Sequence, residues 1–149
     1  MTLETVFLFA GQGTQYHQMG RWMYENHGTF RRTLDGLDAV VREYRGGSIL
    51  DQVYSPDRRP EEAFDRFRDT HPAIFMIEYA LARALMAEGI KPNAVLGASL
   101  GEIAAAAVAG LVRLPLHAHR VGRGRFQGTG GRAAVAHRPD PAAVVHHRR

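Results

Sequence analysis

Cysteine is absent from this chain of 149 residues, so no disulfide framework can hold it together, although this absence leaves the compartment open. Long apolar runs are missing too, and no segment has the pattern of a secretory signal or a membrane span. Zinc-type ligand spacing is also lacking, because no cysteine or acidic residue stands at the required distance from the histidine pairs. We therefore expect a cytoplasmic protein with no membrane partner and no metal.

Acidic residues are nearly absent from the last part of the chain. Residues 111–149 hold eight arginines and one acid, net +7, whereas residues 1–110 hold 11 Lys/Arg and 14 Asp/Glu, net −3. The tail shows neither a 3.6-residue nor a 2-residue apolar period. We expect residues 1–110 to form one domain part and 111–149 to be a basic tail, disordered or translated out of frame. Nucleic-acid binding is less favoured, since the tail holds one aromatic residue, Phe126, and no recognition module.

The most informative motif is Gly-Ala-Ser-Leu-Gly at residues 97–101. It follows an aliphatic run and opens into an alanine-rich segment, which together predict a strand, a tight turn and a helix. A serine in such a turn projects as a nucleophile, and the Leu100 amide points at the oxyanion that develops during attack. The competing interpretation is a plain glycine-rich turn in which Ser99 only caps the helix, since Ser99 and Glu102 have capping-box spacing.

A second glycine motif, Gly11-Gln12-Gly13, follows the apolar run 6–10. The run predicts a buried first strand, and the glycines predict a sharp bend at its carboxyl end, where α/β sheets bind ligands. Such a bend would present the Gln12 amide and side chain to a ligand. It is not a dinucleotide fingerprint, because the third glycine is out of place and no acidic residue closes a second strand.

Helical patterns fill the region between these motifs. Apolar faces at 34–41 and 49–53 predict short helices, and the mixed charges of 61–67 predict a surface helix. The longest expected helix runs from Pro72 to Glu88, with Pro72 in its first turn. Its predicted core face consists of four aliphatic residues at helical spacing, namely Ile74, Ile77, Leu81 and Leu85.

Three blocks in this order, at residues 6–15, 70–78 and 96–102, resemble the malonyl-CoA:acyl-carrier-protein transacylase family, which includes the acyltransferase domains of fatty-acid and polyketide synthases. They read VFLFAGQGTQ, THPAIFMIE and LGASLGE. The resemblance covers the family's amino-terminal part, about residues 5–110. It implies an α/β-hydrolase-like core, a parallel sheet flanked by helices, that is incomplete and lacks the family's ferredoxin-like subdomain.

The resemblance also implies an acyltransferase of fatty-acid or polyketide biosynthesis. Its substrate would be an acyl-CoA, with malonyl-CoA favoured, and its partner an acyl carrier protein whose phosphopantetheine thiol receives the acyl group. No cofactor is implied. Transfer would pass through an acyl-serine, and the resemblance maps the family's site onto a nucleophile, two oxyanion amides and three substrate-binding positions: Ser99; Gln12 and Leu100; Gly11, Ala98 and Arg125.

Two departures from the family's pattern leave alternative functions open. Ala98 stands where the family usually has histidine, which is typical of enzymes that act in trans, both loading transacylases and acyl hydrolases. The start at Met1, shortly before the first strand, favours the same free-standing type. The family's catalytic base, a downstream histidine, has no matching motif here, so the base is absent and the chain is alternatively an inactive fragment. His71 could approach the site, but a histidine before a helix more often caps it or faces solvent.

Overall fold

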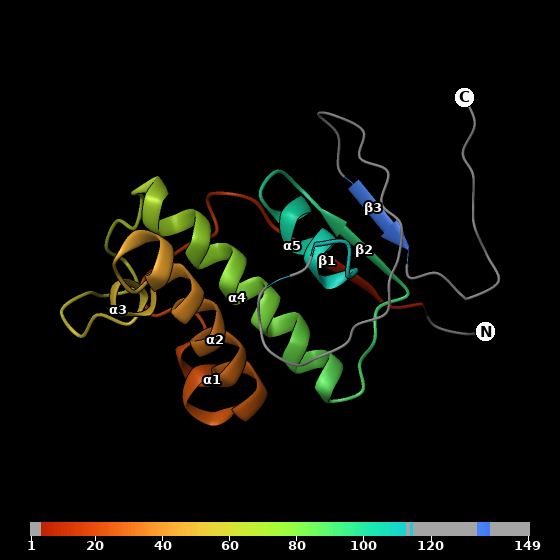
Figure 1. The fold of residues 1–149 in the computed structure, drawn as a ribbon, viewed down its shortest axis with the longest axis horizontal. Coiled ribbons are helices and arrows are strands. Elements are labelled where there is room, and N and C mark those ends of the chain that lie inside the picture. The colour runs from red at the N-terminus through yellow and green to blue at the C-terminus, as the bar shows by residue number, and fades with distance from the viewer. Residues whose placement is uncertain (1–3, 113, 115–133, 138–149) are drawn as a thin grey trace.

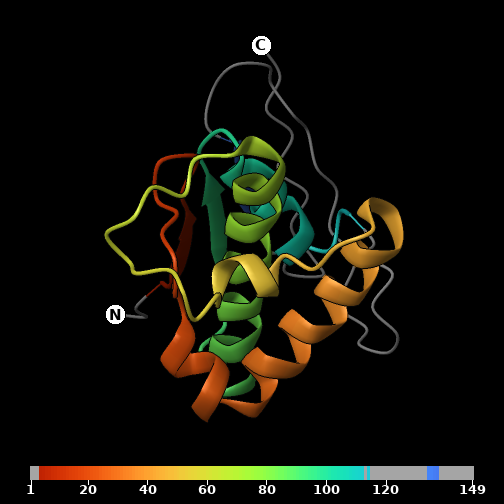
Figure 2. The ribbon, with the colours of Figure 1, turned by 90° about the vertical axis from the view of Figure 1, so that its left-hand side faces the viewer.

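A computed structural model describes residues 4–112 and 114 in full and residues 134–137 as backbone. In these residues the elements follow one another as β1 (Val6–Phe9), α1 (Arg21–Asn26), α2 (Gly28–Arg45), α3 (Leu50–Val53), α4 (Phe67–Ala87), β2 (Ala94–Gly97), α5 (Gly101–Val108) and β3 (Ala134–His137). Figure 1 shows the sheet and α5 on one side of the long helix α4, with α1, α2 and α3 on the other. The turned view in Figure 2 shows α4 in front of the strands.

The sheet has the order β1-β2-β3. β1 and β2 run parallel in a register that pairs Val6 with Ala94 and Phe9 with Gly97, and β3 lies antiparallel to β2. Helices therefore connect two parallel neighbours, as the α/β expectation requires. Because both strands end at the same edge, the loops that follow Phe9 and Gly97 lie next to each other. The absence of a ferredoxin-like subdomain stays a prediction.

β1 is buried on one face only. Phe7 and Phe9 belong to the core, whereas Val6 is 49% and Leu8 72% exposed. The expectation of a buried strand is thus wrong for half of its side chains. Successive side chains point to opposite faces of a sheet, and the described helices cover only one of those faces.

α4 begins earlier than predicted and continues through Pro72. Proline has no amide hydrogen for the carbonyl four residues before it, here that of Arg68. The Arg45 guanidinium donates to this carbonyl instead, at 2.8 Å, and also pairs with Asp69. The placement of Pro72 in the first turn is wrong, because a side chain from the end of α2 replaces the missing hydrogen bond.

The buried face of α4 consists mainly of small residues. Of the predicted core positions Ile74 is buried, while Leu81 is 41% exposed. The other buried apolar positions are Ala73, Met76, Tyr79, Ala80, Ala82 and Ala84. Alanines let two helices approach closely, and α4 contacts α5, whose residues 104–107 are also buried alanines. The predicted core face is confirmed for Ile74, and Ile77 and Leu85 pack partly buried against the core. It is wrong for Leu81, and it missed the alanines because it weighed side-chain size rather than fit.

The helix predicted at 61–67 does not form before residue 67. Phe64 is buried with its ring 4.6 Å from that of His17, and Glu62 accepts a hydrogen bond from the Arg59 amide at 2.9 Å. These contacts hold the segment in turns. The helix predicted over 34–41 is confirmed within α2, which ends at Gly46 in the left-handed conformation with φ 75°.

Most of the segment 111–149 lies outside the described residues. Its described part includes β3, a strand where the composition predicted none. The prediction of a basic, disordered or out-of-frame tail otherwise stays a prediction. Among the helices that the structure describes, none has the length and apolar character needed to cross a bilayer.

Candidate active site

Ser99 lies in the turn between β2 and α5 and is exposed to solvent. Its φ is 54°, in the left-handed region that residues with a side chain rarely adopt. Two backbone hydrogen bonds brace the turn, from the Gly101 amide to the Ala98 carbonyl at 2.9 Å and from the Ala98 amide to the Phe9 carbonyl at 3.1 Å. A strained serine between a strand and a helix is the geometry of a nucleophile elbow.

The glycines on either side of Ser99 are required by close backbone contacts. A Cβ atom on Gly97 would overlap the Gly101 carbonyl, and one on Gly101 would overlap the Phe9 carbonyl. The first turn of α5 is therefore pressed against the end of β1. Only glycine fits at both positions, as the motif predicted.

Helix capping by Ser99 is not what the structure shows. α5 begins at Gly101 with Leu100 as its capping residue, and no side chain caps it. The Ser99 carbonyl, not its hydroxyl, accepts from the Glu102 amide at 3.0 Å. The Ser99 hydroxyl group therefore takes no part in capping α5.

The loop after β1 lies against the serine turn. A Cβ atom built on Gly11 would stand 3.0 Å from the Ala98 carbonyl oxygen and 3.2 Å from the Ser99 Cβ atom. Within the described part of the chain, neither the Gln12 amide nor the Leu100 amide donates a hydrogen bond. The structure therefore brings together the predicted residues of both loops, and two candidate oxyanion donors there have no acceptor.

His71 also lies beside this loop. Its Nε2 atom is 3.5 Å from Oε1 of Gln12, and its ring meets the Phe67 ring edge-on at 5.2 Å between centroids. The residue belongs to the second turn of α4 and does not precede the helix. Of the two interpretations, approach to the site fits the structure and helix capping does not.

Glu78 is a site neighbour that the sequence analysis missed. Its Oε1 atom accepts a hydrogen bond from the Ala10 amide at 2.6 Å, and its Oε2 atom is buried without a partner. Burial raises the pKa of the Glu78 carboxyl to about 7, although the hydrogen bond from Ala10 acts in the opposite direction. An acid inside the apolar run 73–81 was the available signal.

A cavity of about 250 Å³ lies beside this carboxyl group. Apolar side chains from α1, α2 and α4 form most of its wall, and Thr14, Tyr16 and Glu78 add polar groups. The cavity thus extends from the loop after β1 along α4.

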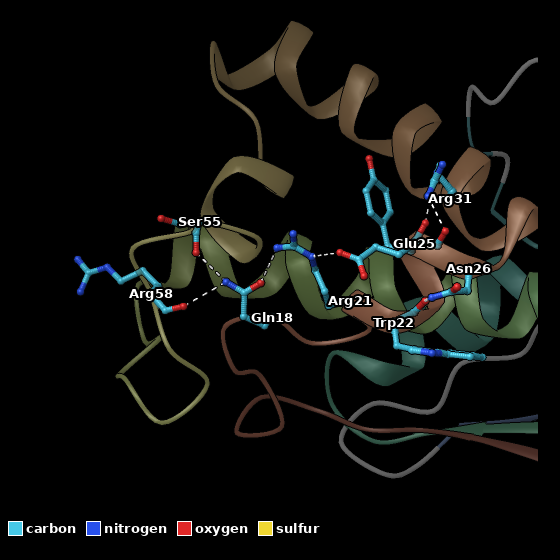
Figure 3. A network of polar contacts seen from close by, with 9 residues as sticks. Gln18, Arg21, Trp22, Glu25, Asn26, Arg31, Ser55 and Arg58 are labelled. Atoms are coloured by element: carbon cyan, nitrogen blue, oxygen red, sulfur yellow. Dashed lines mark hydrogen bonds and ion pairs between the residues drawn. The ribbon is translucent and has the colours of Figure 1, made fainter.

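The chain after the glycine loop is anchored by Gln18, which has φ 67°. Its side-chain amide donates to the carbonyls of Ser55 at 2.6 Å and Arg58 at 3.1 Å, and its Oε1 atom accepts from Arg21 at 2.9 Å. Figure 3 shows this network continuing from Arg21 to Glu25. The segment that follows the glycine loop is thereby fixed to the loop after α3.

The remaining predicted residues are placed as follows. Ala98 is exposed beside Ser99. Arg125 lies outside the described residues. In the part of the chain that the structure describes, no group of three or more histidine or acidic side chains could hold a metal ion.

A parallel strand pair with helices between its strands, and an exposed serine at positive φ at its carboxyl end, define an α/β protein. Residues 6–137 match the acyl transferase domain family, and the chain belongs to this family.

Relatives and solved structures agree with this assignment. The chain is 46% identical over 111 residues to the polyketide biosynthesis acyltransferase homolog PksD of Bacillus subtilis, covering 74% of this chain and 34% of that protein. It matches the acyl transferase domain of ZmaA with a TM-score of 0.69 and 34% identity, over 74% of this chain and 26% of that one. For the MCAT of Streptococcus pneumoniae the TM-score is 0.61 and the identity 34%, over 72% and 32% of the two chains. The chain thus spans about a third of the length of PksD.

Proposed function

We propose that Ser99 accepts an acyl group from an acyl-CoA, malonyl-CoA before others, and passes it to the phosphopantetheine thiol of an acyl carrier protein. The observation that carries the proposal is the exposed serine at φ 54°, facing a loop whose Gly11 lies against the Ser99 turn. Family membership and the similarity to PksD, a polyketide biosynthesis acyltransferase homolog, support the same chemistry.

The reaction divides into two acyl transfers, from the thioester of the acyl-CoA to a serine ester and from that ester to the thiol of the carrier protein. In the first, the Ser99 hydroxyl attacks the thioester carbonyl, its proton passes to a base, and the CoA thiolate leaves. In the second, the carrier-protein thiol attacks the acyl-serine and releases the serine hydroxyl. Each attack creates an oxyanion that the Gln12 and Leu100 amides would bind, while the amino end of α5 adds partial positive charge.

Two components of the proposal are not supplied by the residues that the structure describes. The malonate carboxylate would pair with Arg125, because a guanidinium binds carboxylates through two hydrogen bonds. The base stays unassigned. Without a base, serine acylation is slowed by a factor on the order of 10⁴ or more, so an inactive fragment is one outcome of the test.

A second candidate function is removal of acyl groups from carrier proteins by hydrolysis. The exposed Ala98 favours it, since a small apolar neighbour of the nucleophile leaves more room for water and for varied acyl chains. The two functions differ in the acceptor. Loading of the carrier protein would support transfer, and release of free acid without loading would support hydrolysis.

The experiment is intact-mass analysis after incubation with malonyl-CoA or acetyl-CoA. We expect an adduct that Ser99→Ala lowers at least about 10³-fold. Ser55→Ala is the matched control, because only the carbonyl of Ser55 takes part in the hydrogen bonds around Gln18. An adduct that survives Ser99→Ala would exclude Ser99 as the nucleophile, and a folded wild-type chain without any adduct would identify an inactive fragment.

A further inference from the structure

We propose that Glu78 is a positioning residue, whose carboxyl group holds the Ala10 amide and thereby fixes the Gly11-Gln12 turn against Ser99. The inference rests on the proposed function, in which the Gln12 amide is one of the two oxyanion donors. It assigns a role to a side chain on α4 that does not itself touch the serine turn.

The hydrogen bond between Ala10 and Glu78 lies where the pairing of β1 with β2 ends. The last bond between the two strands runs from the Ala98 amide to the Phe9 carbonyl at 3.1 Å. The next amide of the chain, that of Ala10, finds its acceptor in Glu78 at 2.6 Å. The oxyanion candidate Gln12 follows two residues later. The direction in which the chain leaves the sheet is therefore set by a side chain 68 residues away in the sequence.

The partly buried Glu78 carboxyl group lowers the stability of the fold, which argues against a role in stability alone. One carboxyl oxygen has no partner, and a buried polar atom without a hydrogen bond destabilises the fold. Within the described residues no charged side chain offsets this, since only burial and the Ala10 amide shift the pKa of Glu78. The one other titratable group on the cavity wall is Tyr16.

An ionisable acceptor makes the position of the turn depend on protonation. A carboxylate accepts a hydrogen bond more strongly than a neutral carboxyl group does. Ionisation of Glu78 would thus tighten its hold on Ala10 and shift the Gln12 amide relative to Ser99. A neutral acceptor of the same shape would hold the turn in one position at every pH.

The first test follows the backbone amides by NMR as a function of pH. We expect the Ala10 and Gln12 amide shifts to titrate with one midpoint, near the pKa of about 7 of Glu78, and both changes to vanish in Glu78→Gln. Glu88→Gln, on the exposed end of the same helix, should leave the titration unchanged. Because His71 lies 3.5 Å from the Gln12 side chain, the comparison is made in a His71→Gln background. There, a Gln12 amide that does not respond, or that responds in Glu78→Gln as well, would overturn the proposal.

The second test measures the rate of Ser99 acylation per folded molecule. Glu78→Gln keeps an acceptor for the Ala10 amide, so its acylation rate should stay within about threefold of the wild-type rate. The change in that rate near pH 7 should disappear in this variant. Glu78→Met removes the acceptor and should lower the rate about tenfold. Wild-type rates in Glu78→Met would refute the positioning role. If the Ala10 and Gln12 amide shifts titrate together as expected but the wild-type chain forms no adduct, the proposed function is overturned instead.

Discussion

The turns after β2 and β1 lie against each other but are held in different ways. After β2 the constraint is steric, because a Cβ atom on Gly97 would overlap the Gly101 carbonyl and one on Gly101 would overlap the Phe9 carbonyl. After β1 the constraint comes from a distant helix, through the hydrogen bond from Ala10 to Glu78. One turn is thus set by close backbone contacts, within the turn and with the end of β1, and the other depends on a side chain of α4. Substitutions on the two turns should separate these kinds of constraint.

The largest effect is expected for Gly101→Ala. The new Cβ atom would overlap backbone carbonyls at the end of β1, which have no freedom to retreat. We expect the free energy of unfolding to fall by about 3 kcal/mol or more, as for severe overpacking. Denaturant unfolding measures this change.

Gly47→Ala is the control for that prediction, since a Cβ atom at Gly47 meets nothing within 4 Å. It should change stability by no more than about 0.5 kcal/mol. Equal effects of the two substitutions would contradict a steric origin of the serine turn.

A smaller and more selective effect is expected for Gly11→Ala. Its Cβ atom would stand 3.0 Å from the Ala98 carbonyl oxygen, a contact that a shift of a few tenths of an ångström relieves. Since that shift moves the loop away from Ser99, acylation should slow about tenfold with little loss of stability. Acyl-serine formation, normalised to the folded fraction from circular dichroism, tests this. Loss of stability in step with loss of rate would argue for a structural role only.

The difference between the turns also explains what the sequence could predict. Strand, turn and helix around Ser99 follow from spacing and glycine placement, and the structure has all three. The core face of α4 could be predicted only in part, because alanines such as Ala80 and Ala84 are buried while Leu81 is 41% exposed. Their burial depends on which helix lies opposite, which spacing alone does not reveal.

The site neighbours were missed for a similar reason. Glu78 reads in the sequence as an isolated acid in an apolar run, and its partner is a backbone amide far away in the chain. The start of α4 was misplaced because the acceptor left free by Pro72 is satisfied by Arg45 from another helix. Long-range hydrogen bonds to backbone groups leave no periodic signal in a sequence.

Stability should depend on pH through Glu78. Burial raises the pKa of its carboxyl from 4.5 to about 7 in the folded state. Below pH 4.5 both states hold the proton; as the pH rises toward 7 the unfolded chain releases it first, so stability falls and then levels off. The loss should be on the order of 1 kcal/mol, because the side chain is only partly buried and solvent screens its charge. The difference between wild-type and Glu78→Gln unfolding curves from pH 4 to 8 isolates this effect, and a difference that does not vary with pH would contradict it.

The smallest effect is expected for Gln12→Ala, which separates the amide of Gln12 from its side chain. The side chain is exposed, and its contact with His71, at 3.5 Å, is at the limit of a hydrogen bond. The amide that would bind the oxyanion is kept in alanine. We therefore expect acylation of Ser99 to change by less than about threefold, against the 10²–10³-fold loss typical of a missing oxyanion donor. Single-turnover acylation with malonyl-CoA measures the rate. A loss in the larger range with an unchanged fold would show that the Gln12 side chain itself contacts the acyl group, and that His71 orients it there.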